Sequence, residues 1–348
     1  MTTAIKYFFI SLAIAGLLLK PLPTMAKGTE TILKVATLAP EGSVWVTRFQ
    51  EFDQEVRNKT AGAVGFRIYA GGVMGDDRSM YRKMKIGQLH GAGLTMIGIS
   101  EIVPDFRVMS IPFLFKSYDE VDSVWQGLKP RLIESFKQKD MLLLAITEVG
   151  FVYPMSTIPI ASPEDLKRGK CWIPDGDPLS KTYLELAGIT PTPLAIPDVL
   201  SSLQTGLIKT VFNGYYGAIV LQWFTKIKYV TDIPIGYAYG AMVLDQGAIA
   251  RLTPEQIRII QNAADHYLSE VLKNDTRQSN LESLIVLKEN GIKTVATDHS
   301  AKSSYETIRD KTIALETGRS FSKEIYQEAV QYLTRFRQQQ FPETGPAR

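Results

Sequence analysis

The chain has 348 residues, of which 39 are Lys or Arg and 36 are Asp or Glu, so its formal net charge at pH 7 is +3. A charge this close to zero, with both signs interspersed, gives no indication of a nucleic-acid-binding protein. The length is large for one hydrophobic core and suits two, and the single cysteine, Cys171, excludes an intramolecular disulfide.

The first 26 residues have the pattern of a secretory signal peptide. Lys6 supplies a positive charge, and the apolar run from Tyr7 to Leu19 is too short to span a bilayer comfortably. Small residues at Thr24 and Ala26 suit a signal peptidase, so we expect cleavage after Ala26 and a periplasmic mature protein. Cleavage removes two lysines and no acidic residue, which lowers the formal charge to +1. A retained membrane anchor is the alternative.

The first half of the mature chain alternates short apolar runs with segments of helical periodicity. Ser43 is a good helix cap, and apolar residues follow it at helical spacing from Trp45 to Val56. The run from Met141 to Thr147 is apolar throughout, which is typical of a strand in a parallel sheet covered on both faces. We expect strands at Ile32–Thr37, 64–68, His90–Met96 and Met141–Thr147, and helices that begin near Ser43, Asp77 and Ser117.

The second half repeats this alternation, which together with the first half predicts α/β architecture. Ser162-Pro163 and Asp177-Pro178 are strong helix starts because each pairs a capping side chain with proline at the first helical position. We expect helices from Ser162, from Asp177 and over Pro197–Thr205, and strands at Lys170–Pro174, Thr192–Ile196 and Ile208–Phe212.

A long helix is predicted to begin at Thr253-Pro254-Glu255-Gln256. Its apolar stripe continues without proline to a stop at Asn290-Gly291. If unbroken, this helix is about 50 Å long, whereas a small domain is about 30 Å across. It should therefore touch both folded units and act as a spine. A kink near Asn274 is the alternative.

Sequence motifs that would carry catalysis or metal binding are absent. The chain contains no phosphate-binding loop, no G-x-S-x-G and no H-E-x-x-H. His90, His266 and His299 lack ligand spacing, and Asp76-Asp77 suits a turn or helix cap better than a calcium loop. We therefore expect no catalytic residue, no cofactor and no metal.

Aromatic residues near strand and loop ends are the candidates for ligand contacts, because ligands sit at strand ends in open α/β sheets. Core packing is the alternative for each of them. They are Trp45, Tyr153, Trp172, Phe212, Tyr215, Tyr216, Tyr237 and Tyr239.

Several segments resemble, in order and spacing, the substrate-binding receptors of tripartite ATP-independent periplasmic (TRAP) transporters of the DctP type. The resemblance covers nearly the whole mature chain. The matching segments are Leu33–Ala36 with Pro40–Ser43, Gly71–Asp77, Ile111–Phe115, Ser162–Lys170 and Leu203–Gly206. The resemblance implies a two-lobed periplasmic-binding-protein fold of type II, strand crossovers at the hinge, and closure over one small ligand without catalysis.

Within this resemblance we expect lobe I to contain residues 27–149 and about 238–277. Lobe II would contain residues 150–237 and about 278–335, and 336–348 would form a flexible tail. The implied partners are a small-molecule ligand and the membrane subunits of a TRAP transporter. We expect a monomer. An α/β enzyme, or a receptor that keeps its ligand for sensing or storage, is the rival interpretation.

The chain departs from the family where ligand carboxylates are usually bound. Members mostly bind organic acids through an arginine on the strand after a Gly-Lys element, and many add a second after a Gly-Phe pair. Here Trp172 and Val152 stand at those places, while Asn213 matches an asparagine common in the family.

This departure predicts the ligand class. A buried carboxylate without a cation costs several kcal/mol, whereas an indole offers an apolar face and one N–H donor. We expect an apolar, aromatic or weakly polar ligand. The alternative is a carboxylate held by another cation, such as Arg78, Arg82 or Arg107, or by a metal ion. The predicted contacts are Trp172, Val152, Asn213, Trp45, Tyr153, Tyr216 and Tyr237.

Overall fold

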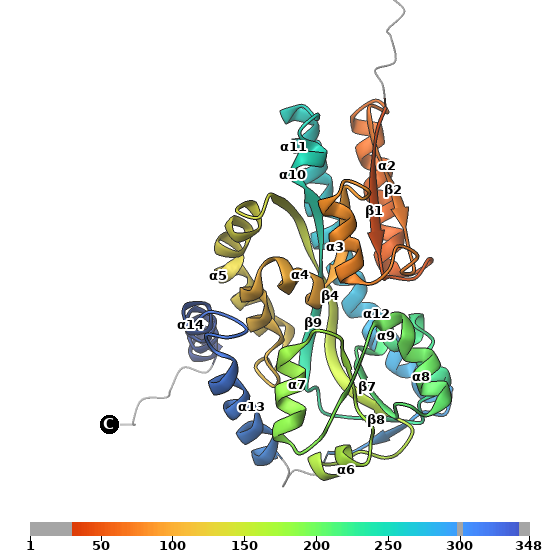
Figure 1. Ribbon diagram of the computed structural model, residues 1–348, viewed down its shortest axis with the longest axis vertical. Helices are drawn as coiled ribbons and strands as arrows, with labels where there is room; N and C mark the ends of the chain where they lie inside the picture. Colours follow the sequence, from red (N-terminus) through yellow and green to blue (C-terminus); the bar gives the residue numbers. More distant parts are fainter. Residues whose placement is uncertain (1–29, 298–301, 341–348) are drawn as a thin grey trace, which may run out of the picture.

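Two long strands run through both halves of the molecule (Figure 1). They are β4 (Met141–Ser156) and β9 (Gly236–Asp245), which pair antiparallel from Met141–Asp245 to Val152–Gly236. The computed structural model describes residues 30–297 and 302–340. The predicted signal peptide, with its cleavage site after Ala26, lies outside the described residues.

The sheet of lobe I extends from one edge of this central pair. β9 pairs with β3 (Gly91–Thr95), β3 with β1 (Thr31–Thr37), and β1 with β2 (Val64–Tyr69). The helices predicted in this lobe are present as α2 (Val44–Lys59), α3 (Asp77–Lys85) and α5 (Tyr118–Lys137), each capped by the side chain of the preceding residue. The α/β, two-lobed prediction is confirmed.

The sheet of lobe II uses the far end of β4. Strands β7 (Thr210–Asn213) and β8 (Tyr229–Thr231) pair antiparallel with β4, and β10 (Lys293–Val295) pairs parallel with β8. Strands β5 (Trp172–Pro174) and β6 (Thr192–Leu194) form a small parallel sheet. A bridge between Cys171 and Thr210 joins this small sheet to β7.

The prediction of a parallel strand at Met141–Thr147 is wrong. β4 pairs antiparallel with β9, β7 and β8, and it continues to Ser156. Its apolar run instead reflects two core clusters, since Met141 belongs to one cluster and Leu144 to the other. Burial on both faces makes a strand apolar whatever the direction of its partners.

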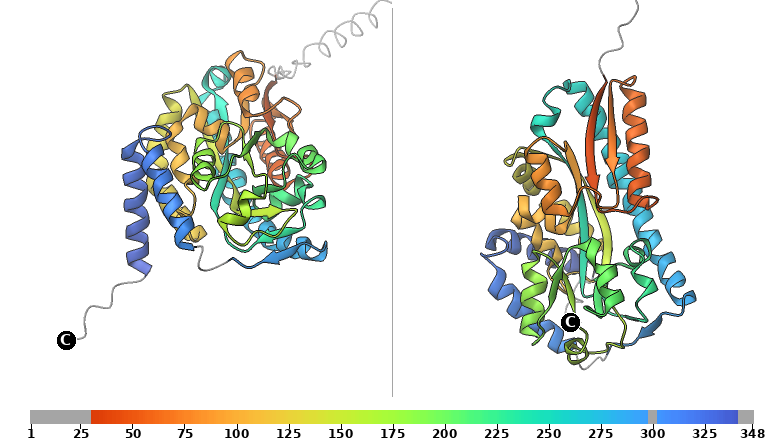
Figure 2. Two further views of the ribbon diagram at one scale, coloured as in Figure 1. Left: turned by 60° about the horizontal axis from the view of Figure 1, so that its bottom comes forward. Right: turned by 45° about the vertical axis from the view of Figure 1, so that its right-hand side comes forward.

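The predicted spine helix is confirmed. α11 (Pro254–Ala264), the π-helical segment η4 (Asp265–Val271) and α12 (Leu272–Glu289) follow one another without a break, and Figure 2 shows them running along the molecule past both lobes. A capping box at Thr253 starts the helix. The alternative prediction was a kink near Asn274. The irregular part of the helix is instead the π-helical segment, which ends three residues before Asn274.

The C-terminal helices correct two expectations about the chain's organisation. α13 (Lys302–Glu316) packs on α7 (Pro178–Leu186), but α14 (Lys323–Gln340) packs on α5 of lobe I. Arg337 Nε donates to Glu120 Oε1 over 2.8 Å. The chain between 323 and 335 therefore does not belong with lobe II, and residues 336–340 are helical rather than a tail. The division into lobes otherwise stays a prediction.

Short helices complete the described chain. None of the helices in 30–297 and 302–340 combines the length and the apolarity that crossing a membrane would require. They are α4 (Met96–Ile102), η1 (Pro104–Ser110), α6 (Pro163–Lys167), α7 (Pro178–Leu186), η2 (Ile196–Asp198), α8 (Val199–Thr205), α9 (Tyr215–Val220), η3 (Trp223–Thr225) and α10 (Gln246–Ile249).

Candidate functional site

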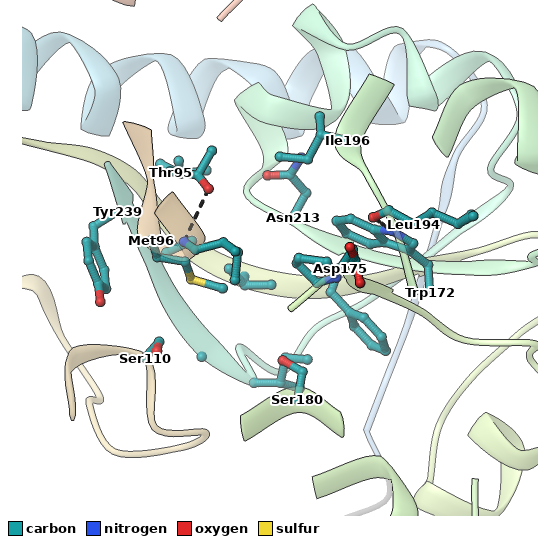
Figure 3. Close-up of a pocket in the computed structure, with 18 of the residues that line it drawn as sticks. Thr95, Met96, Ser110, Trp172, Asp175, Ser180, Leu194, Ile196, Asn213 and Tyr239 are labelled. Atoms are coloured by element: carbon teal, nitrogen blue, oxygen red, sulfur yellow. Dashed lines mark hydrogen bonds between the residues drawn. The ribbon is translucent and has the colours of Figure 1, made fainter. Parts of the chain in front are cut away.

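A cavity of about 170 Å³ lies beside β4 and β9, with walls from both lobes (Figure 3). Thr95 and Met96, at the end of β3, belong to the lobe I wall, and Trp172 and Asn213, on β5 and β7, belong to the lobe II wall. The lining is mostly apolar. A concave, apolar space at strand ends between two lobes is where a small ligand is expected to bind. We call it the Trp172 chamber.

A second cavity, of about 140 Å³, shares part of its wall with the first. Its other walls include Trp45 on α2 and Leu272 on the spine helix. We call it the Trp45 chamber. The residues that line both chambers are Leu38, Thr95, Val149, Ile196, Asn213 and Tyr239.

Trp172 lines the chamber and is also part of the core of lobe II. Its relative exposure is 3%, and its ring centroid lies 5.3 Å from that of Trp223 at an interplanar angle of 78°. The indole N–H donates to the Leu194 carbonyl over 3.0 Å. Because this hydrogen bond uses the single polar group of the side chain, Trp172 offers a ligand an apolar surface only.

Val152 and Tyr237 face the same chamber from the paired strands β4 and β9. The buried Tyr237 hydroxyl donates to Glu148 Oε1 over 3.0 Å. Burial, and then the Glu148 carboxylate, raise the pKa of Tyr237 well above its ordinary value, so the phenol stays neutral. Glu148 itself is paired with Arg277 on α12. Tyr237 therefore contributes its ring to the wall, while its hydroxyl belongs to this buried network.

Asn213 is the predicted contact with an unused polar group. It lines both chambers, and its Oδ1 accepts the Gly214 backbone N–H over 2.8 Å. That bond fixes the amide orientation, which leaves Nδ2 without a partner among the described residues. In Figure 3 the Asn213 side chain lies between Thr95 and Trp172. The structure thus brings Trp172, Val152, Tyr237 and Asn213 to one cavity.

Trp45 and Tyr216 meet where the two lobes touch beside the Trp45 chamber. Their ring centroids are 5.0 Å apart, and the Val44 backbone N–H donates to the Tyr216 hydroxyl oxygen over 2.8 Å. The Trp45 indole N–H donates to the Glu148 carbonyl over 2.8 Å. Trp45 lines the second chamber, whereas Tyr216 lines neither.

Tyr153 lies apart from both chambers. Its ring stacks on Tyr215 at a centroid distance of 4.2 Å and an interplanar angle of 15°. It packs against the core cluster of lobe II that contains Trp172. Of the seven residues predicted to contact ligand, five line a chamber, Tyr216 lies at the lobe contact, and Tyr153 is partly buried against the core of lobe II.

Asp77 and Thr95 form a wall element that sequence reasoning missed. Asp77 Oδ1 accepts the Thr95 backbone N–H over 2.8 Å, and Oδ2 accepts the Thr95 hydroxyl over 2.7 Å. Thr95 Oγ1 also accepts the Ile97 N–H at the start of α4, the bond drawn in Figure 3. Burial raises the pKa of Asp77 to about 6. The sequence predicted a turn or helix cap at Asp76-Asp77, and Asp76 does cap α3. No local pattern in the sequence indicates that Asp77 bonds to Thr95, 18 residues later.

Arg78 is the one basic side chain that lines either chamber in the described part of the chain. Its side chain is 42% exposed and bonds to Glu101 over 2.8 Å and to Asp175, across the cleft, over 3.3 Å. Arg82 and Arg107 instead bond to Ser79 and to the Ser320 carbonyl. The wall of the Trp172 chamber also contains Asp76, Asp77 and Asp175. Its charge balance is therefore acidic, which opposes the burial of an anion.

Within residues 30–297 and 302–340, no group of three or more His, Cys, Asp or Glu side chains is placed to hold a metal ion. Cys171 is buried, and burial raises the pKa of its thiol to about 12. Such a thiol stays protonated at neutral pH, which suits a structural role.

Comparison with known families gives a match over most of the chain. Residues 35–313 match the family model DctP, described as bacterial extracellular solute-binding protein, family 7. A solute-binding protein of Chromohalobacter salexigens is 30% identical over 168 residues, 48% of this chain and 50% of that protein. The C4-dicarboxylate-binding periplasmic protein DctP of Rhodobacter capsulatus is 23% identical over 214 residues, 61% of this chain and 63% of that protein. The chain thus spans about half the length of the first curated relatives it matches.

Solved structures share the fold over nearly their whole length. A TRAP periplasmic solute-binding protein from Sulfitobacter sp. NAS-14.1, with bound β-D-galacturonate, is 20% identical with a TM-score of 0.78, covering 87% of this chain and 99% of that chain. The sugar acid binding protein DctPAm from Advenella mimigardefordensis, in complex with galactonate, is 16% identical with a TM-score of 0.83, covering 88% of this chain and 99% of that chain. At these identities the likeness concerns the fold.

Proposed function

The chain belongs to family 7 of the bacterial extracellular solute-binding proteins, and from this premise we propose that it captures a small molecule between its lobes and delivers it to the membrane subunits of a TRAP transporter. The protein acts in the periplasm after its signal peptide is removed. It binds its ligand without transforming it, as a solute-binding protein rather than an enzyme.

The proposed ligand is apolar, aromatic or weakly polar. The observation that carries this is Trp172, which occupies the place of the family's arginine, lines the cavity and has its N–H bonded to Leu194. A carboxylate buried against that face would lack a cation and would bear a desolvation cost of several kcal/mol. The similar proteins named for C4-dicarboxylate, or solved with galacturonate, bind acids; in this chain the wall chemistry differs.

A receptor for organic acids is the second candidate, and Arg78 is the observation in its favour. Its guanidinium lies at the cavity wall and could turn from Asp175 to a ligand. Asp175 would then lose its partner, and the anion would lie in a wall that also contains Asp76 and Asp77, which makes this arrangement the weaker one.

Closure of the lobes over the ligand is part of the proposal. Tyr216 and Asp175 of lobe II already touch Val44 and Arg78 of lobe I, and rotation of two lobes about a hinge is a known way to enclose a ligand. Small-angle scattering should show a smaller radius of gyration with ligand than without it. N-terminal sequencing of periplasmic protein should begin at Lys27.

The decisive experiment is mass spectrometry of the solute that co-purifies with periplasmic protein, followed by calorimetric titration with dicarboxylates, 2-oxo acids and aromatic solutes. We expect a neutral or weakly polar solute to bind most tightly. Tight binding of a small dicarboxylate, unaffected by Trp172→Ala, would contradict the proposed ligand class. Transport and sensing are distinguished by measuring uptake of the identified solute in cells with and without the membrane subunits of the TRAP transporter.

A further inference from the structure

The two chambers share wall residues from both lobes. Leu38 and Thr95 come from lobe I, Ile196 and Asn213 from lobe II, and all four line both spaces. We call these four residues the waist. The chambers measure about 170 and 140 Å³. Neither alone reaches the roughly 300 Å³ at which small-molecule pockets begin, but together they do.

We propose that the two chambers form one site for an uncharged, elongated ligand, with an apolar or aromatic group against Trp172, a hydrogen-bond acceptor at Asn213 in the waist, and a second apolar group in the Trp45 chamber. This rests on the proposed receptor function and specifies the ligand's charge, length and polar group.

The first argument is that most hydroxyl and indole donors in the wall of the Trp172 chamber are already bonded within the protein. Six side chains there have their hydrogen committed to another protein group, so a ligand that needs several donors finds few. The committed donors are Thr95 to Asp77, Ser110 to the Arg107 carbonyl, Trp172 to the Leu194 carbonyl, Ser180 to Asp177, Tyr237 to Glu148 and Tyr239 to the Phe106 carbonyl.

The second argument is the position of one unused donor. Asn213 is part of the waist because it lines both chambers. Its Oδ1 accepts the Gly214 N–H, so Nδ2 is the amide atom that remains for a ligand. Asn213 also packs against Gly217, where a Cβ would collide with the amide, so the side chain has little room to rotate. A fixed amide donor between two apolar spaces suits an amide, ketone, ester or ether in the middle of a ligand.

The third argument is charge. The Trp172 chamber is lined by three aspartates and by Arg78, whose guanidinium is already paired with Glu101 and Asp175. The Trp45 chamber has Glu148 in its wall, already paired with Arg277. A ligand anion in either chamber would face carboxylates without a free cation among the described residues. An uncharged ligand avoids that repulsion.

Three probes test this by calorimetric titration of the mature protein. N-butylbenzamide has an aromatic ring, a central amide and a butyl tail. Benzamide lacks the tail, and 4-benzamidobutanoate replaces the terminal methyl with a carboxylate. We expect N-butylbenzamide to bind at least tenfold more tightly than either of the others.

Two matched variants assign the ligand's parts to the chambers. Ala195 lines the Trp172 chamber alone and Ala39 the Trp45 chamber alone. Ala195→Phe should weaken the binding of both N-butylbenzamide and benzamide at least tenfold. Ala39→Phe should weaken the binding of N-butylbenzamide to the same degree, while the affinity for benzamide stays within threefold of the wild type. Thermal unfolding of both variants verifies that they fold.

The outcomes separate this inference from the receptor function. Binding of 4-benzamidobutanoate as tight as that of N-butylbenzamide, equal sensitivity of benzamide to both variants, or no binding of any probe would overturn the inference. A co-purifying solute and ligand-induced closure would still support a receptor in each of those cases. Absence of both would instead refute the receptor function.

Discussion

Arg277 on the spine helix donates two hydrogen bonds to the buried carboxylate of Glu148, at the point where β4 passes from one lobe to the other. The Nε–Oε2 distance is 2.9 Å and the Nη2–Oε1 distance is 2.6 Å. The same guanidinium bonds to Asp122 and lies 4.3 Å from the centre of the Tyr118 ring. Glu148 is 5% exposed and Arg277 20%. The register of β4 shifts between Glu148 and Gly150, so this pair ties the helix to an irregular part of the strand.

Arg277→Met should destabilise the protein by about 3–5 kcal/mol, because it leaves Glu148 charged, buried and unpaired. Urea unfolding measures the loss. Arg277→Lys keeps the charge but loses the bidentate geometry. Its free energy of unfolding should therefore lie between those of the wild type and Arg277→Met. Adding Glu148→Gln to Arg277→Met should recover much of the stability; a double variant no more stable than Arg277→Met would show that the ion pair is not the cause.

Trp172→Ala should weaken ligand binding a hundredfold or more, a typical cost of removing a central aromatic contact. Because Trp172 is 3% exposed and packs on Trp223, the same change should also cost about 3–5 kcal/mol of stability. Calorimetry and urea unfolding measure the two effects.

Trp172→Phe is the control for that variant. It keeps a ring face but removes the donor to the Leu194 carbonyl, so we expect a stability loss of roughly 1–3 kcal/mol from the unpaired carbonyl. Ligand affinity should fall far less than in Trp172→Ala. Equal loss of affinity in the two variants would show that the ligand uses the indole N–H after all.

Asp77 should make stability fall as pH rises from about 4 to 6. Burial raises the pKa of its carboxyl from 3.8 to about 6 in the folded protein. Between those values the folded state holds a proton that the unfolded state has released, so folding is favoured below the window and less so above it. A shift of this size corresponds to about 3 kcal/mol.

Asp77→Asn isolates this contribution, because asparagine does not titrate. The difference in unfolding free energy, wild type minus Asp77→Asn, should decrease between pH 4 and 7. Urea unfolding at several pH values provides it. A difference that does not change with pH would mean that the pKa of Asp77 is the same in the folded and unfolded protein, which would contradict the prediction.

Arg78→Gln should leave the affinity for the physiological solute within about threefold. Its bonds to Glu101 and Asp175 are partly exposed, and such pairs contribute about 0–1 kcal/mol. Asp175→Asn, which removes the partner across the cleft, should behave alike. A loss of more than tenfold in Arg78→Gln alone would identify Arg78 as the ligand's cation and favour the organic-acid alternative.

Local features were predictable because local physics determines them. Ser43 and Thr253 cap helices where their sequence context placed the caps, and the spine helix follows from a start signal with a long apolar stripe. β9 was missed although Tyr237 and Tyr239 alternate with small residues, because its pairing partners lie about 90 and 145 residues earlier in the chain and no local pattern identifies them. Strand direction in β4 likewise depends on distant partners that periodicity does not reveal.

The candidate site was predictable where the family pattern applied and obscure elsewhere. Trp172, Val152 and Asn213 were found by comparing each position with its usual residue. Thr95 and Ile196 carry no chemical signal in the sequence; they line the cavity because the strands and turns that hold them end there. Tyr153 was equally aromatic in the sequence, but its position on β4 turns it toward Tyr215.

The position of β9 in the chain has a consequence for the order in which the protein can fold during synthesis. β9 pairs with β3 and β4 in the middle of the lobe I sheet, yet it spans residues 236–245. A nascent chain that ends before β9 has β1, β2 and β3 but lacks the strand that joins them to β4. Lobe I therefore cannot complete its sheet until lobe II is almost fully made, so the two lobes should mature together and late rather than one after the other.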